Sequence, residues 1–477
     1  MLSRAWVNWT SKPEHCSYSF AFLLIISLAL AIAVEHPLPI IIPAGFVGLF
    51  YISFNPRHFY LVFFLLLPFS VELELPGGFG TDLPAEPLMR ILTMVALIYI
   101  IKNITRETTG FVRHPITLML ILHVFWIVFA SIFSTQGFIS AKFSIAKVWY
   151  VLPFFFLPPL LLDNEKQYYK LFSFLTVGLL ISVAYVMLRH ASMGFSFDSI
   201  NKAVRPIYRN HVSYGVLLVE VLPFYVYIMY RTRKWPYLKM AGLIFILLAI
   251  YQTYTRAAHI SVFLGLGAYF VIKYKLAKPA IAVGLALILS LSINLSVGNN
   301  YLNIAPDYNK AVEHKKFDNL VEATYKMEDI STVERFYRWI AGVNMVRAKP
   351  LIGFGPGTFY SEYKPYTVTS YKTYVSDNPD QSGVHNYYLM TAAEQGLPGM
   401  LIFLGLCLIS IVYGERLYHS LSERNEKMLI MATTVCFVLI LAVLLINDLL
   451  EAVKIGPFFF LCLSILVYYD QKLKQAK

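Results

Sequence analysis

The sequence predicts an all-α polytopic integral membrane protein with about 12–14 transmembrane helices and one mainly helical domain inserted outside the membrane near the C-terminal end. Of its 477 residues, 57% are hydrophobic and 14% are charged, and the mean hydropathy is +0.59. Many apolar runs reach the roughly 17–25 residues that cross a bilayer. Such runs must be helical, because the hydrocarbon core holds no water for unpaired backbone groups.

Hydropathy predicts fourteen spans, in chain order: 18–34, 37–54, 58–72, 88–102, 115–134, 148–162, 169–188, 212–230, 238–254, 257–273, 279–297, 393–413, 427–446 and 452–469. The third, fourth and sixth are short for a bilayer. Twelve true spans with a re-entrant pair is therefore an alternative. The first span has no small-residue cleavage site after it, so we expect it to be a retained helix rather than a signal peptide.

The charges predict which loops lie in the cytoplasm. The 40 Lys and Arg against 28 Asp and Glu give a net charge of +12. With both termini inside, every short basic loop also lies inside, as the positive-inside rule requires, and the acidic loop Glu72–Glu86 lies outside. The basic charge is thus explained by topology, and no motif suggests binding to nucleic acid.

The chain divides into four predicted parts: N-terminal spans (1–190), core spans with arginine-bearing outer loops (191–297), a large outer loop domain (298–390) and C-terminal spans (391–477). The loop domain holds ten Lys and Arg and ten Asp and Glu. It is too long for a simple connection.

The spacing predicts a helix over 322–347 in this domain, ended by Lys349-Pro350 and followed by the turn Gly353–Gly357. Its apolar face comprises Val333, Tyr337, Ile340, Ala341, Asn344 and Met345.

The first candidate site residues are Arg205 and Arg209, which precede an outer span that opens at His211. A guanidinium group offers a planar fork of donors that matches phosphate oxygens. The structural alternative is contact with lipid headgroups, since interfacial arginines commonly extend toward them. His211 is a supporting candidate, or simply the first residue of the helix.

Arg256 lies in a tight outer turn between two predicted spans. A charge at membrane depth is costly unless it is compensated. We expect either a bound phosphate or a structural carboxylate such as Glu220 to compensate it.

Arg335 and Arg338 lie three residues apart on the predicted outer helix and share one face. They are candidates for the same anionic ligand. The alternative is a solvated face on which they pair with Glu334 or Glu328.

His385 lies where the outer domain returns to the membrane, next to Asn386 and nine residues before Glu394. A histidine can take up a proton near neutral pH, so His385 is the candidate general base, with Asn386 and Glu394 in support. The sequence carries no motif with metal-ligand spacing in the outer loops and no phosphate-binding loop for ATP. We therefore expect neither metal nor cofactor.

Three of these segments resemble the O-antigen ligase and O-antigen polymerase superfamily of bacterial membrane glycosyltransferases. They are Thr255-Arg256-Ala-Ala; Arg335-x-x-x-Trp339 with Lys349-Pro-Leu-Ile-Gly-Phe-Gly-Pro-Gly-Thr-Phe359; and His385-Asn-Tyr-Tyr-Leu with Glu394-x-Gly-Leu-x-Gly399. The resemblance covers about residues 200–410. The family is usually described with about twelve spans, so the fourteen predicted here are a departure from it.

The resemblance implies a reaction at the periplasmic face of the inner membrane. A glycan leaves undecaprenyl pyrophosphate for an acceptor hydroxyl, without metal and with inversion at the anomeric carbon. His385 and Arg256 would be catalytic, and Arg205, Arg209, Arg256, Arg335 and Arg338 would hold the pyrophosphate. The acceptor would be lipid A-core for a ligase, another lipid-linked unit for a polymerase, or a protein hydroxyl for an oligosaccharyltransferase. We expect the ligase.

A transporter of lipid-linked glycan is the alternative from another class, with membrane lipids as its surroundings in either case. A transporter often shows repeated halves with broken helices and charges near the midplane. Here the candidate arginines gather on one predicted side of the membrane and the outer domain is single, which favours an enzyme.

Overall fold

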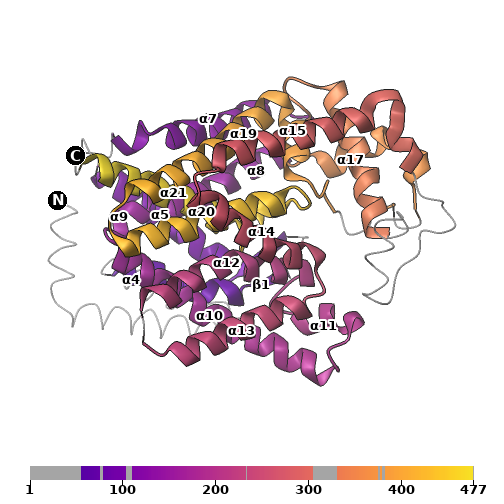
Figure 1. Cartoon of the computed structure of the whole chain (residues 1–477). Coiled ribbons are helices and arrows are strands. Elements are labelled where there is room, and N and C mark those ends of the chain that lie inside the picture. The colour runs from indigo at the N-terminus through magenta and orange to yellow at the C-terminus, as the bar shows by residue number, and fades with distance from the viewer. Residues whose placement is uncertain are drawn as a thin grey trace, which may run out of the picture. The chain divides into compact units, whose positions relative to one another are not determined.

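The computed structural model describes residues 55–75, 79–103, 110–232, 234–304, 330–373, 376–378 and 382–475 (Figure 1). The chain divides into two units, residues 1–63 and 64–477. Of the first unit, the described part is the beginning of helix α4 (Pro56–Leu66). The predicted spans 18–34 and 37–54 lie outside the described residues.

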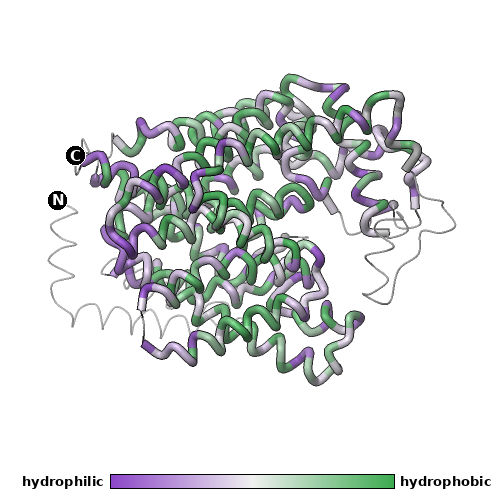
Figure 2. Tube along the Cα trace, in the orientation of Figure 1, coloured by the Kyte–Doolittle hydropathy of each residue, from purple (hydrophilic) through white to green (hydrophobic). Residues whose placement is uncertain are grey.

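The described residues contain seven helical segments that are long and apolar enough to cross a membrane: Pro115–Ile132 (α7), Gly137–Leu161 (α8, η3 and α9), Glu165–Ser192 (α10), His211–Arg231 (α12), Ala277–Leu295 in α15 (Ala277–Ser296), Tyr387–Ser420 (α19) and Arg424–Leu444 (α20). The chain is an all-α polytopic membrane protein. Figure 2 shows hydrophobic residues along the bodies of these helices and hydrophilic residues at many of their ends.

Four further helices coincide with predicted spans: α5 (Ala85–Lys102), α13 (Pro236–Gln252), α14 (Arg256–Lys273) and α21 (Gly456–Gln475). Within the second unit, α12 packs against α10, α13, α14 and α20, and α19 packs against α7, α20 and α21. Because most helices that carry candidate residues contact α12, α19 or α20, this packing fixes the ends of those helices relative to one another.

Two predicted spans have wrong boundaries. The span 58–72 ends early: α4 stops at Leu66, a 3-10 turn follows (η2, Leu67–Phe69), and residues 71–83 form an antiparallel hairpin of β1 (Val71–Leu75) and β2 (Phe79–Leu83), with Val71 paired to Leu83. Alternating apolar and acidic residues favour a β-strand, in which side chains repeat every two residues. The hydropathy average over 58–72 did not separate this strand pattern from the helical pattern before it.

The span predicted at 148–162 begins too late. The structure has it at Gly137–Leu161, through α8 (Gly137–Val151), the π-helical turn η3 (Leu152–Phe156) and α9 (Pro158–Leu161). Hydropathy excluded the first part because of Lys147. That side chain is buried and forms an ion pair with Glu451, so its charge is compensated within the protein.

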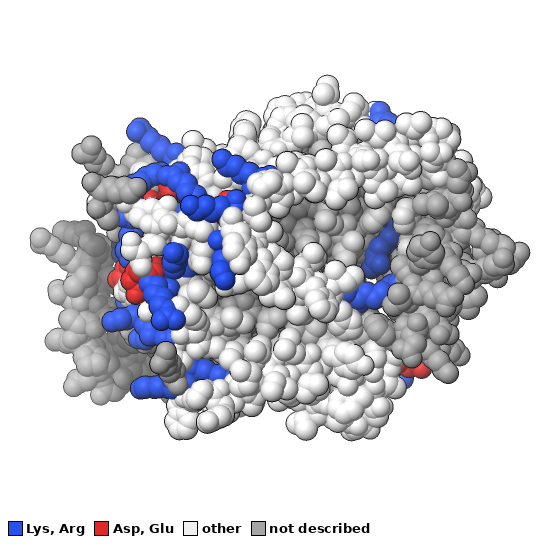
Figure 3. All heavy atoms as spheres, viewed as in Figure 1, with Lys and Arg blue, Asp and Glu red and all other residues white. Residues whose placement is uncertain are grey.

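Lys and Arg side chains gather at the end of the second unit where α21 finishes (Figure 3). Arg231, Lys273, Arg424, Lys472 and Lys474 each lie at a helix end that the charge pattern assigns to the cytoplasm. The separation of charge along the helix bundle therefore agrees with the predicted topology.

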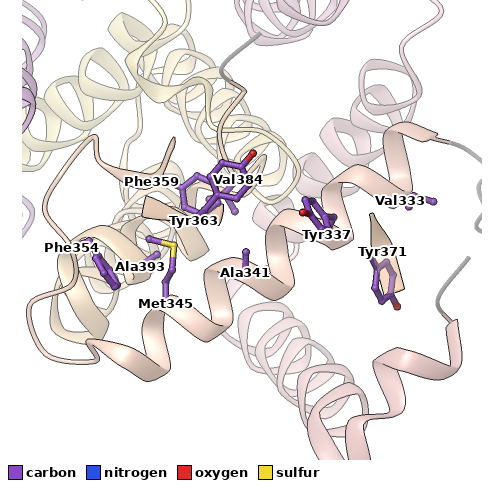
Figure 4. Close-up of a cluster of buried hydrophobic side chains, with 10 residues drawn as sticks. All are labelled: Val333, Tyr337, Ala341, Met345, Phe354, Phe359, Tyr363, Tyr371, Val384 and Ala393. Carbon is purple, nitrogen blue, oxygen red and sulfur yellow. The ribbon is translucent and has the colours of Figure 1, made fainter. Parts of the chain in front are cut away.

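The predicted outer helix is present as α17 (Ile330–Ala348); residues 322–329 of the prediction lie outside the described part of the chain. Its apolar face is confirmed, since Val333, Tyr337, Ala341 and Met345 are buried in one cluster with side chains from the following turns and from α19 (Figure 4). The helix ends before Lys349-Pro350, as predicted. This cluster attaches the outer helix to the membrane-spanning part of the chain.

Candidate functional site

The site begins with a break in α19 that the glycine turn Gly353–Gly357 occupies. Gly396 lies at φ 72° and ψ 174° inside α19, so the helix is two helices joined by a kink. A Cβ on Gly396 would lie 2.2 Å from the carbonyl oxygen of Leu351. Only glycine combines this positive φ with so close an approach of another backbone. The outer turns of α19 are thereby fixed to the loop domain.

Glu394, a supporting candidate, holds this glycine turn. Its buried carboxylate accepts hydrogen bonds from the amides of Gly357 (2.8 Å) and Phe359 (2.9 Å). Buried polar groups require such partners. The geometry gives Glu394 a structural task, which is to keep the turn against the first helix of α19.

His385 and Asn386 lie immediately before α19. The Asn386 side chain caps the helix by accepting from the amide of Leu389 (2.9 Å), as an N-cap residue does. His385 lies at φ 55°, in the left-handed region where non-glycine residues are uncommon and often functional. The cap fixes the point at which the chain enters α19.

Asp448 faces His385 from the connection between α20 and α21. Its Oδ1 lies 3.8 Å from Nδ1 of His385, which is within ion-pair range but too long for a hydrogen bond. Its Oδ2 accepts weakly from the His385 amide at 3.5 Å. A Cβ on Gly383 would lie 1.9 Å from Oδ2 of Asp448, so a glycine at 383 is what allows the carboxylate to approach.

Arg335 and Arg338 of α17 are the cations beside this pair. Arg338 is buried and donates to Glu334 (3.2 Å), and Glu334 also accepts from the hydroxyls of Thr373 and Ser376. The alternative pairing with Glu334 is thus present for Arg338, whereas Glu328 lies outside the described residues. Although Arg338 pairs with Glu334, its positive charge still acts on His385 and Asp448.

The charges of both arginines reach His385 and Asp448. Burial, together with Arg335 and then Arg338, lowers the pKa of His385 from 6.5 to about 3. Burial raises the pKa of Asp448, and the two arginines act against that rise. His385 is therefore a neutral imidazole at pH 7, which is the form that can accept a proton.

Arg256 and His211 lie at the beginnings of neighbouring helices. Arg256 is half-buried as the first residue of α14, and the hydroxyl of Thr255 donates to the carbonyl of His211 (3.4 Å). Both carboxylate oxygens of Glu220 are buried in α12 without a hydrogen bond from any described residue. Glu220 therefore does not provide the expected structural hydrogen bond to Arg256.

The start of α12 also adjoins the segment that carries Asp448. Val212, next to His211, packs in one apolar cluster with Leu449, next to Asp448. The structure thus brings His385, Arg335 and Arg338 together around Asp448 and places the beginning of α12 beside that group.

Arg205 and Arg209 lie on an exposed loop that is tied to the same connection through Lys454. The ammonium group of Lys454 donates to the carbonyls of Pro68 (3.1 Å) and Ile207, and it lies 4.0 Å from the centre of the Tyr208 ring. Figure 3 shows a hollow in the middle of the viewed face, with basic side chains at its margin. The loop is thus tied to the connection between α20 and α21, while Arg205 and Arg209 themselves stay exposed.

Lys454 also faces the acidic hairpin. Burial, with Glu72 and Glu86, raises the pKa of Asp82 to about 6, while Lys454 and Arg209 act in the opposite direction. Burial lowers the pKa of Lys454 to about 7, opposed by Asp82. Among the described residues, no group of three or more His, Cys, Asp or Glu side chains could hold a metal ion. Asp82 of the hairpin thus lies in the field of two cations of the chain, Lys454 and Arg209.

A family model described as O-antigen ligase matches residues 241–404. The match begins in α13, includes Arg256, Arg335, Arg338 and His385, and ends within α19. Residues 241–404 of the chain are thus similar to the O-antigen ligase family. Members of this family are membrane enzymes of the glycosyltransferase type that join glycans, and this similarity agrees with the resemblance seen in the sequence. A comparison with curated proteins found no match for this chain.

Asp448 and Lys454 are the functional candidates that the sequence did not single out, and neither lies within 241–404. A signal was present for Asp448, because it is an acid in a short predicted outer loop between two apolar spans. The pairing with His385 lies 63 positions away in the sequence, so only tertiary structure reveals it.

Proposed function

We propose that this protein transfers a glycan from undecaprenyl pyrophosphate to an acceptor hydroxyl at the periplasmic face of the bacterial inner membrane. The acceptor that fits the family best is lipid A-core, which makes the reaction O-antigen ligation in lipopolysaccharide assembly. The proposal combines the family match over 241–404 with the chemistry of the residues around His385.

The single observation that carries the proposal is the convergence of one neutral base with two cations of α17, of which Arg338 is held by Glu334. His385 approaches Asp448 to 3.8 Å, and both arginines of α17 act on the two of them. Glycan transfer from a lipid pyrophosphate needs both a base and nearby cations. A base must take a proton from the acceptor, and cations must stabilise the departing pyrophosphate.

The proposed step is a direct displacement. An imidazole nitrogen of His385 takes the proton of the acceptor hydroxyl while that oxygen attacks the anomeric carbon of the donor glycan. The bond between this carbon and the pyrophosphate oxygen breaks, and undecaprenyl pyrophosphate leaves with the electron pair. One displacement inverts the anomeric configuration. Asp448 stabilises the imidazolium that forms on His385.

In this proposal, binding of the donor makes His385 a stronger base. Before the donor binds, burial, together with Arg335 and Arg338, holds the pKa of His385 near 3, where an imidazole is a weak base. A pyrophosphate placed on these arginines offsets their positive field, since opposite charges within a few ångströms favour the charged form of a base. Donor binding therefore raises the basicity of His385 in the complex in which it is used.

The arginines supply the positive charge that a metal ion supplies in other phosphate-leaving reactions. Arg335 and Arg338 lie nearest the reacting centre in this proposal. Arg256, half-buried at the start of α14, and the exposed Arg205 and Arg209 bind the pyrophosphate or the adjacent sugar. No cofactor is required, because the donor already carries its leaving group.

The test is transfer by the purified protein from a defined undecaprenyl-pyrophosphate oligosaccharide to competing acceptors. We expect product on lipid A-core, with inverted linkage and with chelator present. Product on a second lipid-linked unit would identify a polymerase, and product on a peptide hydroxyl would identify a protein oligosaccharyltransferase. Movement of the intact donor across vesicles without any transfer would contradict the proposal in favour of transport.

A further inference from the structure

A buried lysine, Lys147, lies outside the glycine and histidine motifs of the site and outside the segment that matches the family model. It belongs to α8, where its side chain is almost completely buried. Its ammonium group contacts the carboxylate of Glu451 and the hydroxyl of Tyr387 (3.3 Å). A buried charge is retained only when it is paired and hydrogen-bonded, and Lys147 meets both conditions.

The carboxylate of Glu451 is the centre of this network. Besides contacting Lys147, its Oε1 accepts from the hydroxyl of Tyr387 at 2.8 Å. The backbone carbonyl of Glu451 accepts from the hydroxyl of Tyr150 at 2.6 Å, again from α8. Glu451 is therefore held at its side chain and at its backbone by residues of one helix, which fixes the short turn η8 (Leu449–Glu451).

The network joins the same two segments that carry the proposed base and its carboxylate. Tyr387 is two residues after His385, and Glu451 is three residues after Asp448. The contact of His385 with Asp448 at 3.8 Å thus has a second contact beside it between the same two segments, Tyr387 with Glu451. Lys147 contacts both members of this second pair.

We infer that Lys147 is a positioning residue for the His385–Asp448 pair, an inference that rests on the proposed function of that pair. Its ammonium group holds the carboxylate of Glu451 in place. Glu451 in turn holds Tyr387 and η8, and this contact sets the spacing between the segment 385–387 and the segment 448–451. Without Lys147 the carboxylate of Glu451, whose side chain is 26% exposed, loses its cation. The two segments then separate or rotate as that carboxylate turns toward water.

The test compares three variants in the full-length protein in detergent or nanodiscs. Lys147→Met keeps the length of the side chain but removes the charge. Lys147→Met with Glu451→Gln removes both charges and leaves an amide oxygen to accept from Tyr387. The matched control is Arg231→Met, which breaks another ion pair, with Glu165 (3.0 Å), at the opposite end of α12. Single-turnover transfer and binding of an undecaprenyl-pyrophosphate oligosaccharide are measured for each.

For Lys147→Met we expect turnover to fall about 10²-fold, which is the cost of misplacing catalytic groups by an ångström, with donor binding unchanged. The double variant recovers most of the turnover, since replacing a buried pair is tolerated far better than breaking it. Arg231→Met keeps wild-type turnover in the protein that remains folded. This pattern of loss and recovery separates positioning from general loss of structure.

Wild-type turnover in Lys147→Met would overturn the inference, as would a double variant no better than the single one. A loss of the same size in folded Arg231→Met would also overturn it, because the effect would then be common to broken ion pairs. Failure of the proposed function has a different signature: no transfer by the wild type, or full transfer by His385→Ala.

Discussion

The two groups of candidate arginines are held in different ways. Arg338 is buried on α17, paired with Glu334, and acts together with Arg335 on His385 and Asp448. Arg205 and Arg209 are themselves exposed, on a loop held by its neighbours Ile207 and Tyr208, which contact Lys454. Arginines on α17 and arginines on the exposed loop therefore need not have the same role in the reaction.

We expect the first group to act on the chemical step and the second on donor capture. A cation that is fixed before the reaction stabilises developing charge without reorganising. A cation on an exposed loop is hydrated and mobile, so it contributes to binding and encounter more than to the barrier. The following predictions test this division, beginning with the largest effect.

Arg335→Ala should lower kcat by about 10²–10³, the usual cost of losing one donor to a developing anion. Arg335 is chosen because its removal does not strip Glu334 of its buried partner, as removal of Arg338 would. Steady-state kinetics with the lipid-linked donor checks the prediction. A change confined to KM would place Arg335 with the loop arginines and remove the distinction.

Gly383→Ala should lower kcat by roughly 10²-fold, because the new Cβ would lie 1.9 Å from Oδ2 of Asp448 and must displace that carboxylate from His385. The matched control is Gly267→Ala in α14, where a Cβ meets nothing within 4 Å. Single-turnover rates at equal amounts of folded protein provide the measurement. Equal rates for both alanine variants would show that Asp448 is not needed at its observed position.

Arg209→Ala and Arg205→Ala should raise KM for the donor a few-fold and leave kcat nearly unchanged, since exposed charge pairs contribute little. The increase should shrink as salt rises, because exposed charges are screened. A large fall in kcat for either variant would mean that the loop closes onto the reacting centre when the donor binds.

The acid limb of kcat/KM should lie well below pH 6.5, because this quantity reports the free enzyme, in which the pKa of His385 is lowered to about 3. Arg335→Gln removes one cause of that shift, so the limb should move toward higher pH, though Arg338, Asp448 and burial still act. Protonation of His385 below its ordinary pKa opposes folding, so acid also lowers stability there. An unmoved limb in the variant would exclude the arginine field as the cause.

The sequence predicted much of the fold, and the reason is visible in particular elements. The apolar face of α17 and its end before Lys349-Pro350 follow from helical spacing and proline chemistry, which are local. The end of α4 and the hairpin were missed because hydropathy averaged over a change from helical to strand periodicity. The start of α8 was missed because the partner of Lys147, Glu451, lies 304 positions further along the chain.

The same division holds for the candidate site. His385, Arg335 and Arg338 stand out in the sequence because charged residues at the outer edge of apolar spans are conspicuous, and the structure brings them together. Asp448 enters the site through tertiary packing, because the connection after α20 contacts α12 through Leu449 and contacts Lys147 and Tyr387 through Glu451. Glu394 and Asn386 are adjacent to the site in sequence, but their hydrogen bonds are to backbone amides, a role that sequence spacing cannot distinguish from catalysis.

The most direct measurement is single-turnover transfer by His385→Ala and His385→Gln, with donor binding measured on the same preparations. General-base help contributes about 10²–10⁴ in rate, and glutamine keeps hydrogen bonding but cannot take up a proton. We predict that both variants lose turnover by this factor while still binding the undecaprenyl-pyrophosphate oligosaccharide through the arginines. Near-wild-type turnover by His385→Gln would contradict the account, because His385 would then only shape the turn before α19.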